Sequence, residues 1–76
     1  MNKQCRMVLS HIERHGTISQ KVAAELYGIQ RLGARIYDLK RLGFPIDGKT
    51  VTGLNRHGDK THWTEYFLEQ EAKEES

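Results

Sequence analysis

The four histidines and the single cysteine are the residues whose chemistry points most directly to a metal or catalytic site. His11 and His15 have the i, i+4 spacing that presents two imidazoles to one metal ion on a helix face. Cys5 lies about 100° around the same helix, so it does not readily complete that site. His57 and His62 have no carboxylate or thiolate neighbour at ligand spacing. The histidine pattern therefore predicts no metal site.

The cysteine, carboxylates and glycines also lack the arrangement that catalysis requires. Cys5 falls on an apolar stripe, where a thiol acts as a small buried hydrophobic group. Glu13, Glu25 and Asp38 belong to different predicted helices, and nothing marks them as an acid–base pair. The glycine spacing at residues 28–33 is not followed by Lys-Ser/Thr, so no phosphate-binding loop is predicted. A chain of 76 residues has little room for a buried active site, and we expect a binding module, not an enzyme, without a cofactor.

The charge is unevenly distributed along the chain. Twelve basic and ten acidic residues give a net charge of +2, but residues 69–76 hold four glutamates and one lysine, a net charge of −3, which leaves +5 on residues 1–68. A compact body of this charge attracts polyanions such as nucleic acids, and the acidic end is typical of a solvated tail. Many small soluble proteins carry such a charge for solubility alone, so the charge only permits a nucleic-acid partner.

Cysteine usage and hydropathy indicate a compartment. A single cysteine excludes an internal disulfide, which fits a reducing cytoplasm. No apolar run approaches the roughly 20 residues of a membrane-spanning helix. The N-terminus also lacks the apolar segment of a signal peptide. We therefore expect a cytoplasmic protein with no membrane partner.

Glycines and helix-capping residues predict three short helices, over residues 3–15, 20–27 and about 31–42. The first helix ends at Gly16 and the second at Gly28, and Ser19 is of the type preferred as an N-cap. The third helix ends at Gly43, and Pro45 prevents its continuation. Apolar residues recur within each helix at spacings of three and four. The predicted buried stripes are Cys5, Val8, Leu9 and Ile12 in the first helix, Val22, Ala23 and Leu26 in the second, and Leu32, Ile36 and Leu39 in the third.

The pattern changes after the proline. Residues 46–52 and 63–67 are rich in strand-forming types, and a turn-rich polar stretch at residues 53–60 separates them. This pattern predicts a hairpin with a long loop, to whose edge Ile18 can add a short third strand. The buried face of the last strand stays open at this point. Tyr66 and Leu68 share one face, and Trp63 and Phe67 share the other.

Two short helices joined by the turn at residues 28–30 form a helix-turn-helix, and a basic-tipped hairpin after them makes a winged helix. The predicted fold class is therefore α+β, a winged helix-turn-helix of three helices followed by a two-stranded wing. It covers residues 1–68, and residues 69–76 form an acidic tail. In such a motif the second helix lies in the major groove of double-stranded DNA and exposes one face to base edges.

The face of the third helix opposite its apolar stripe carries side chains that can read bases. Gln and Arg make bidentate contacts with adenine and guanine, and the small Gly33 and Ala34 let the backbone approach the groove floor. The alternative is that these are ordinary solvated residues, with Asp38 paired to a nearby arginine. The preceding turn and the following hairpin favour DNA. The predicted base-contacting residues are Gln30, Arg31, Ala34, Arg35, Asp38 and Arg41.

Phosphate contacts are predicted at the start of the second helix and at the hairpin tip. Unpaired N–H groups and the dipole at a helix N-terminus favour an anion, although Ser19 can equally serve only as the cap. Basic side chains at the tip can enter the minor groove or lie over phosphates, whereas an exposed loop can also be basic without any such role. The predicted phosphate-contacting residues are Thr17, Ser19, Gln20, Lys21 and Tyr37, and the predicted wing residues are Asn55, Arg56, His57 and Lys60.

Several segments resemble small phage and prophage helix-turn-helix domains, and the resemblance covers about residues 4–68. They are Gly16-Thr17-Ile18-Ser19, Ala24-Glu25-Leu26-Tyr27-Gly28-Ile29, Arg31-Leu32-Gly33-Ala34-Arg35-Ile36, Asp38-Leu39, Gly43 and Tyr66-Phe67-Leu68. The resemblance implies a winged helix that binds DNA in a bacterial host cell. Its role would be that of a transcriptional regulator, or of an excisionase-like factor that bends DNA for a recombinase. Gly33 replaces the more common Ser or Ala, which weakens the helix slightly.

The size of the chain bears on its partners. A single module buries only about 600–1,000 Å² on DNA, so we expect a homodimer or adjacent cooperative copies. A recombinase or a polymerase is a further partner that the resemblance suggests. The alternative class is a protein-interaction winged helix, an adaptor or inhibitor whose basic face docks on an acidic protein of host or phage. A DNA mimic is disfavoured because the folded body is basic.

Overall fold

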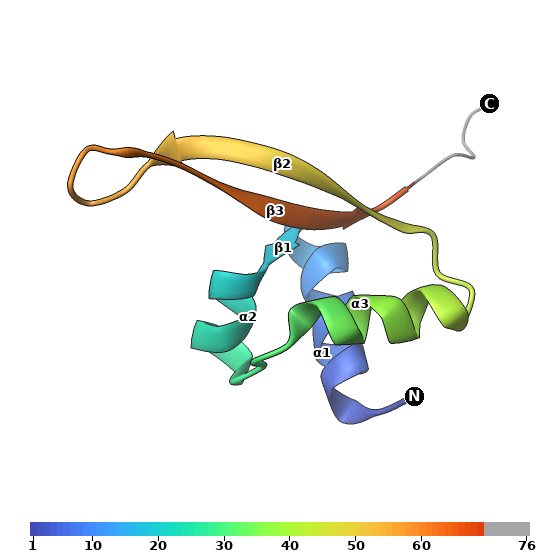
Figure 1. The fold of residues 1–76 in the computed structure, drawn as a ribbon. Helices are drawn as coiled ribbons and strands as arrows, with labels where there is room; N and C mark the ends of the chain where they lie inside the picture. The colour runs from blue at the N-terminus through green and yellow to red at the C-terminus, as the bar shows by residue number, and fades with distance from the viewer. Residues whose placement is uncertain (70–76) are drawn as a thin grey trace.

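A computed structural model describes residues 1–69 of the chain. Within this part the structure has three helices and one three-stranded antiparallel sheet (Figure 1). The elements are α1 (Lys3–His15), β1 (Ile18–Ser19), α2 (Gln20–Tyr27), α3 (Leu32–Arg41), β2 (Ile46–Leu54) and β3 (Lys60–Leu68). The predicted winged helix-turn-helix fold is confirmed. The predicted acidic tail, apart from its first residue, lies outside the described residues.

The helix ends confirm the caps that the sequence predicts. The side-chain oxygen of Ser19 accepts a hydrogen bond of 3.3 Å from the N–H of Val22, which begins α2. Gly28 ends α2 with φ 68° and ψ 22°, a left-handed conformation that glycine adopts without steric cost. At the start of α1, the side-chain oxygen of Asn2 accepts a hydrogen bond of 2.8 Å from the N–H of Cys5, a cap that the sequence analysis did not predict. The predicted bounds 3–15 and 20–27 are both confirmed.

The third helix is one residue shorter at each end than predicted. Arg31 is the N-cap, because its φ of −126° and ψ of 73° are not helical, and its carbonyl accepts the first bonds of the helix. Leu42 is the C-cap, and Gly43 then takes a φ of 104°. The prediction of about residues 31–42 was therefore one residue too long at each end, and Gln30 lies in the connecting turn as predicted.

The sheet has the order β1-β3-β2, so the last strand lies in the middle. Ile18 pairs with Tyr66, which confirms the short third strand. The ladder of β2 and β3 extends to the pair of Leu54 and Lys60, farther than predicted. The loop is therefore residues 55–59 instead of 53–60, because the side chain of Asn55 closes a compact turn that lets the ladder continue.

The core lies where the three helices meet the base of the sheet. Leu26 was predicted to be buried and is 63% exposed, so this prediction was wrong. The neighbouring Tyr27 packs against the core in its place, because its hydroxyl reaches a buried partner on α1. Leu9 is only half-buried. The buried apolar residues are Cys5, Val8, Ile12, Ile18, Ala23, Ile29, Leu32, Ile36, Leu39 and Ile46.

A polar contact joins α1 to α2 inside this core. Nδ1 of His11 lies 2.8 Å from the Tyr27 hydroxyl in a hydrogen bond, and the His11 side chain is buried. The rings of His11 and His15 have centroids 4.5 Å apart. Burial lowers the pKa of His11, and the neighbouring His15 lowers it further. The folded state therefore favours the neutral form of His11 more than the unfolded chain does.

The two faces of the hairpin differ. Tyr66 and Leu68 pack against the core, which settles the question that the sequence left open. Trp63 lies on the opposite, outer face, where its indole N–H donates a bond of 3.0 Å to Glu65. A Cβ atom added to Gly53 would come within 2.9 Å of the Trp63 ring, so the ring covers that glycine closely. Trp63 therefore packs across the hairpin instead of into the core.

Within residues 1–69, every helix is too short or too polar to span a lipid bilayer.

Candidate nucleic-acid interface

The connection between α2 and α3 is held by one side chain, that of Gln20. Its amide nitrogen donates a bond of 2.9 Å to the carbonyl of Ile29, and its amide oxygen accepts a bond of 2.9 Å from the N–H of Leu32. Ile29 and Leu32 are both fully buried. Gln20 thus attaches the first turn of α2 to the beginning of α3 and sets the angle at which α3 leaves the turn. Its predicted phosphate contact stays a prediction, and its amide already has two partners within the fold.

The exposed side of α3 begins in the turn and continues to the last residue of the helix. Gln30 and Arg31 are exposed just before the helix, and Tyr37 and Arg41 are exposed along it. The guanidinium carbon of Arg41 lies 5.9 Å from the centroid of the Tyr37 ring. Ala34, between them, is half-buried. This side therefore presents two arginines, an amide and a phenol around a small central residue.

Arg35 and Asp38 lie on the flank of α3 that faces α1. The Arg35 guanidinium forms an ion pair of 3.2 Å with Asp38 and donates a bond of 3.3 Å to Oε1 of Gln4. The Arg35 side chain is 27% exposed, and its Nε is buried with no hydrogen-bond partner in the described part of the chain. The sequence left open a pairing of Asp38 with a nearby arginine, and the structure shows it with Arg35. Base contacts by Arg35 and Asp38 stay predictions, and either contact would require these bonds to rearrange.

The wing tip is a compact turn closed by Asn55. Its side-chain oxygen accepts bonds of 2.9 Å and 3.0 Å from the N–H groups of His57 and Asp59. Arg56 and His57 are exposed at the tip, and Lys60 is exposed as the first residue of β3. Asn55 therefore shapes the loop, while the cationic side chains project from it.

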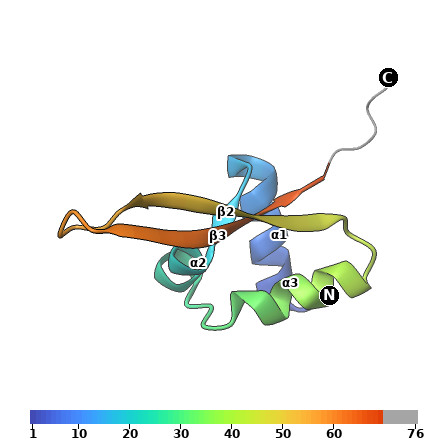
Figure 2. The ribbon, with the colours of Figure 1, turned by 45° about the horizontal axis from the view of Figure 1, so that its top comes forward.

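A groove of about 1,150 Å³ separates the wing from the helix-turn-helix. One wall comes from the start of α2 and of α3, and the other comes from the half of the hairpin that includes its tip. Figure 2 shows this tip extending beyond α2. Glu65 is an acidic residue that lines the groove, and its carboxylate accepts the hydrogen bond from the indole N–H of Trp63. The lining residues that are basic or can become cationic are Lys21, Arg56, His57 and His62.

A comparison of the sequence with models of protein families identifies the family of this chain. The family model of the winged helix-turn-helix domain matches residues 3–71. The chain belongs to this family. Comparisons with curated proteins and with solved structures found no match. Winged helix-turn-helix domains are typically DNA-binding modules without enzymatic activity, so membership indicates DNA as the partner.

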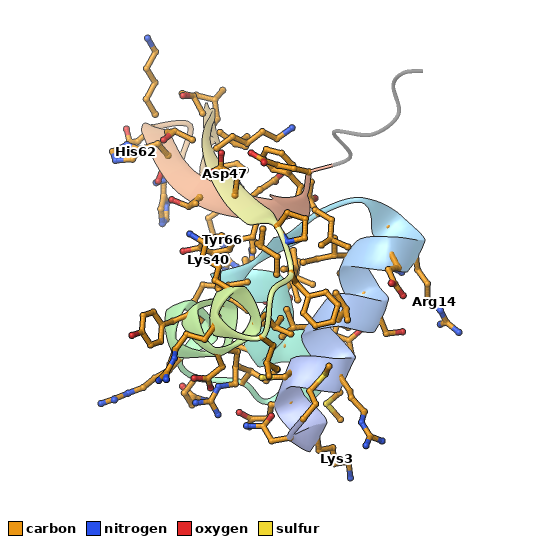
Figure 3. The ribbon with its side chains drawn as sticks, turned by 90° about the vertical axis from the view of Figure 1, so that its right-hand side faces the viewer. Lys3, Arg14, Lys40, Asp47, His62 and Tyr66 are labelled. Atoms are coloured by element: carbon orange, nitrogen blue, oxygen red, sulfur yellow. The ribbon has the colours of Figure 1, made fainter. Side chains whose placement is uncertain are left out.

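Two basic side chains of this winged helix domain, those of Lys40 and His62, were missed by the sequence analysis of the site. Lys40 lies two helical turns after Gly33 and hence on the side of α3 that borders the groove. His62 shares a strand face with Tyr66, which alternation along a strand could have indicated once the buried face was known. Figure 3 shows Lys40 and His62 on the α3 side of the molecule, and Arg14 of α1 on the opposite side. The groove therefore has more basic side chains near it than the sequence predicted.

The predicted phosphate-contacting residues at the start of α2 differ in accessibility. Lys21 is exposed and lines the groove, whereas Thr17 is half-buried. Ser19 is only 8% exposed, and its hydroxyl accepts the capping bond. The structure thus agrees with the reading of Ser19 as a cap, and its phosphate contact stays a prediction. Lys21 is the residue of this set best placed to meet an anion in the groove.

Proposed function

We propose that this winged helix domain binds double-stranded DNA with α3 in the major groove and the wing over the adjoining backbone. The observation that carries the proposal is the continuity of two surfaces, the exposed side of α3 and the cationic groove beside it. A helix entering the major groove needs an uncovered face about as long as α3 itself, and the wing stands beside that face without covering it.

The residues of this surface take two roles in the proposal. Gln30, Arg31 and Arg41 read base edges, while Ala34 permits close approach of the helix backbone. Arg35 and Asp38 position α3 against α1 through their bonds to each other and to Gln4. The groups that would contact phosphate are Lys21, Tyr37, Lys40, Arg56, His57, Lys60 and His62.

The biological role within this proposal is that of a phage-type DNA-binding factor, as the sequence resemblance suggests. Residues 1–68 form the binding domain. A transcriptional regulator and an excisionase-like factor differ in what they do to the duplex, since the second kind bends it. Energy transfer between dyes at the two ends of a bound duplex separates the roles, because bending shortens the end-to-end distance.

The direct test is a titration of duplex DNA across a salt series. We expect log K to fall with log[salt] at a slope near −0.9 for each phosphate neutralised. Arg41→Ala and Arg31→Ala are each expected to weaken binding to a selected site by about 1–3 kcal/mol. Arg14→Ala removes the same charge from the opposite side of the molecule and is the matched control (Figure 3).

Two outcomes would contradict the proposal. Equal losses for Arg41→Ala and Arg14→Ala would mean that the DNA contact is not made by α3. Absence of salt-dependent binding to any duplex would remove DNA as the partner and would favour the protein-interaction class.

A further inference from the structure

The β2 strand has one edge that no other strand covers within residues 1–69. Two backbone amides show which residues point toward it. The N–H of Gly48 donates to Oδ1 of Asp47 at 2.8 Å, and the N–H of Ile46 donates to the carbonyl of Phe44 at 2.9 Å. Neither amide therefore takes part in the ladder to β3. Because N–H groups alternate in direction along a strand, those of Thr50 and Thr52 point to the same open edge.

Two opposite charges stand near each other on this strand without forming an ion pair. Asp47 and Lys49 are two residues apart, so both side chains lie on the outer face of the hairpin. Within the described part of the chain the ion pair present is that of Arg35 and Asp38, and neither Asp47 nor Lys49 takes part in one. The Lys49 ammonium lies 5.9 Å from the centroid of the Phe67 ring. The Asp47 carboxylate accepts a hydrogen bond from the backbone N–H of Gly48, the next residue.

We propose that β2 pairs in antiparallel fashion with β2 of a second copy of this chain, about a twofold axis at Gly48. In this register Gly48 faces the partner's Gly48, and the two exchange backbone hydrogen bonds. Asp47 then faces the partner's Lys49, and Lys49 faces the partner's Asp47. The symmetric pairing therefore creates two ion pairs between Asp47 and Lys49 of opposite copies, and neither residue forms an ion pair within the described part of one copy.

Neighbouring registers lack this complementarity. An axis at Lys49 places that ammonium directly opposite its own copy, and like charges at such positions repel. An axis at Thr50 places Lys49 opposite Val51, and Asp47 opposite Gly53. The axis at Gly48 is the one among these three that places each charge opposite its complement.

Pairing of the two β2 strands also replaces the local hydrogen bond between Gly48 and Asp47. When the strands pair, the N–H of Gly48 passes from the Asp47 carboxylate to the carbonyl of the partner's Gly48. The carboxylate is then available to the ammonium of the partner's Lys49. The Gly48 amide therefore has an acceptor both before and after pairing.

This edge is separate from the proposed DNA surface. Of the nine residues of β2, Leu54 lines the groove beside α3, and it lies at the end away from Gly48. Figure 1 shows β2 above β3 along most of the hairpin, with α2 and α3 below, and Figure 3 shows Asp47 on the hairpin above the helices. Pairing therefore leaves the exposed side of α3 accessible in both copies.

A strand pair of this length gives a small, weak interface, so the dimer is expected to depend on concentration. Sedimentation velocity of the protein without DNA, from low micromolar to millimolar concentration, is expected to show a shift from monomer toward dimer. Asp47→Lys and Lys49→Asp are each expected to abolish the shift, because each places like charges in opposition. The double variant carrying both exchanges restores complementary pairs and is expected to dimerise again.

Matched controls distinguish the effect of the strand register from the effect of a change in net charge. Glu13→Lys and Lys3→Asp reverse charges on α1 and are expected to leave the dimer unchanged. Thr50→Pro removes an N–H that points to the open edge, so it is expected to abolish dimerisation while β2 still pairs with β3. Circular dichroism and thermal unfolding of each variant confirm that it is folded.

A parent chain that stays monomeric over the whole range would overturn the proposal. So would single charge reversals that behave like Glu13→Lys, or a double variant that fails to dimerise. No DNA enters the measurement, so a failure of DNA binding and a failure of dimerisation are observed independently.

Discussion

The helical body and the hairpin of this domain are stabilised in different ways. In the body, buried apolar side chains from all three helices meet in one core, and several of them are fully inaccessible to solvent. Within β2 and β3 the buried residue is Ile46, at the end nearest the body, and toward the tip the side chains are half-buried or exposed. The hairpin there depends on its nine-pair backbone ladder and on side-chain contacts such as Trp63 over Gly53.

Because of this difference, we expect the body to contribute most of the stability and the wing to contribute mainly to DNA binding. Apolar burial contributes most of the folding free energy, and the body holds most of it. The wing adds shape and charge at the edge of the groove. Substitutions in the body are therefore expected to lower the free energy of unfolding, and substitutions at the wing tip to change DNA affinity with little effect on stability.

The largest expected effect is that of Leu39→Ala, in the centre of the body. Leu39 is fully buried, so its truncation leaves a cavity and is expected to lower the free energy of unfolding by about 2–5 kcal/mol. Urea unfolding measures this loss. Val51→Ala, on the half-buried outer face of the wing, is the control and is expected to cost less than about 1 kcal/mol. Equal losses at both positions would contradict the division between body and wing.

Gln20→Ala tests the bonds that attach α2 to α3. The substitution leaves the N–H of Leu32 and the carbonyl of Ile29 without the partners they have in the fold, at an expected cost of about 1–3 kcal/mol in the same assay. Gln30→Ala removes an identical, exposed side chain ten positions later and is expected to change stability by less than about 0.5 kcal/mol. A neutral Gln20→Ala would show that packing alone orients α3.

The burial of His11 makes the body sensitive to pH. Burial and the nearby His15 lower the pKa of His11 in the folded state below its ordinary value of 6.5. The unfolded chain therefore binds more protons as the pH falls through that value, and stability falls with it. We expect the free energy of unfolding to decrease from pH 7.5 to pH 5, by less than the Leu39→Ala effect.

His11→Gln is expected to flatten this pH dependence, whereas His15→Gln is expected to keep most of it. Parallel thermal melts of the two variants across the pH range measure the difference. A His11→Gln variant with the pH profile of the parent would show that another group is responsible.

The smallest expected effect on stability is at the wing tip. Arg56→Ala removes an exposed side chain and is expected to change the free energy of unfolding by less than about 0.5 kcal/mol. If Arg56 neutralises one phosphate, the slope of log K against log[salt] is expected to become shallower by about 0.9. Fluorescence anisotropy with a labelled duplex measures the slope. An unchanged slope would place the wing tip away from the phosphate backbone.

The exposure of side chains on α3 and beside it shows what could be predicted from the sequence and what could not. The exposure of Arg41 follows from helical periodicity, because its position opposite the apolar stripe is a local property. Gln30 and Arg31 are exposed in the turn before the helix, where that periodicity does not apply. The partial burial of Arg35 does not follow, since it depends on how Gln4 of a distant helix approaches that flank. The burial of Tyr27 in place of Leu26 also depends on a distant segment, because the Tyr27 hydroxyl bonds to His11 of α1 across the core.

The sequence by itself determined the helices and the hairpin, because caps, glycine conformations and the period of apolar residues act over a few neighbouring positions. The tertiary structure alone decided which face of β3 packs on the core and which side chains border the groove. These features depend on contacts between segments far apart in the chain, such as the pairing of Ile18 with Tyr66. Such contacts form only when burial of apolar surface brings whole elements together.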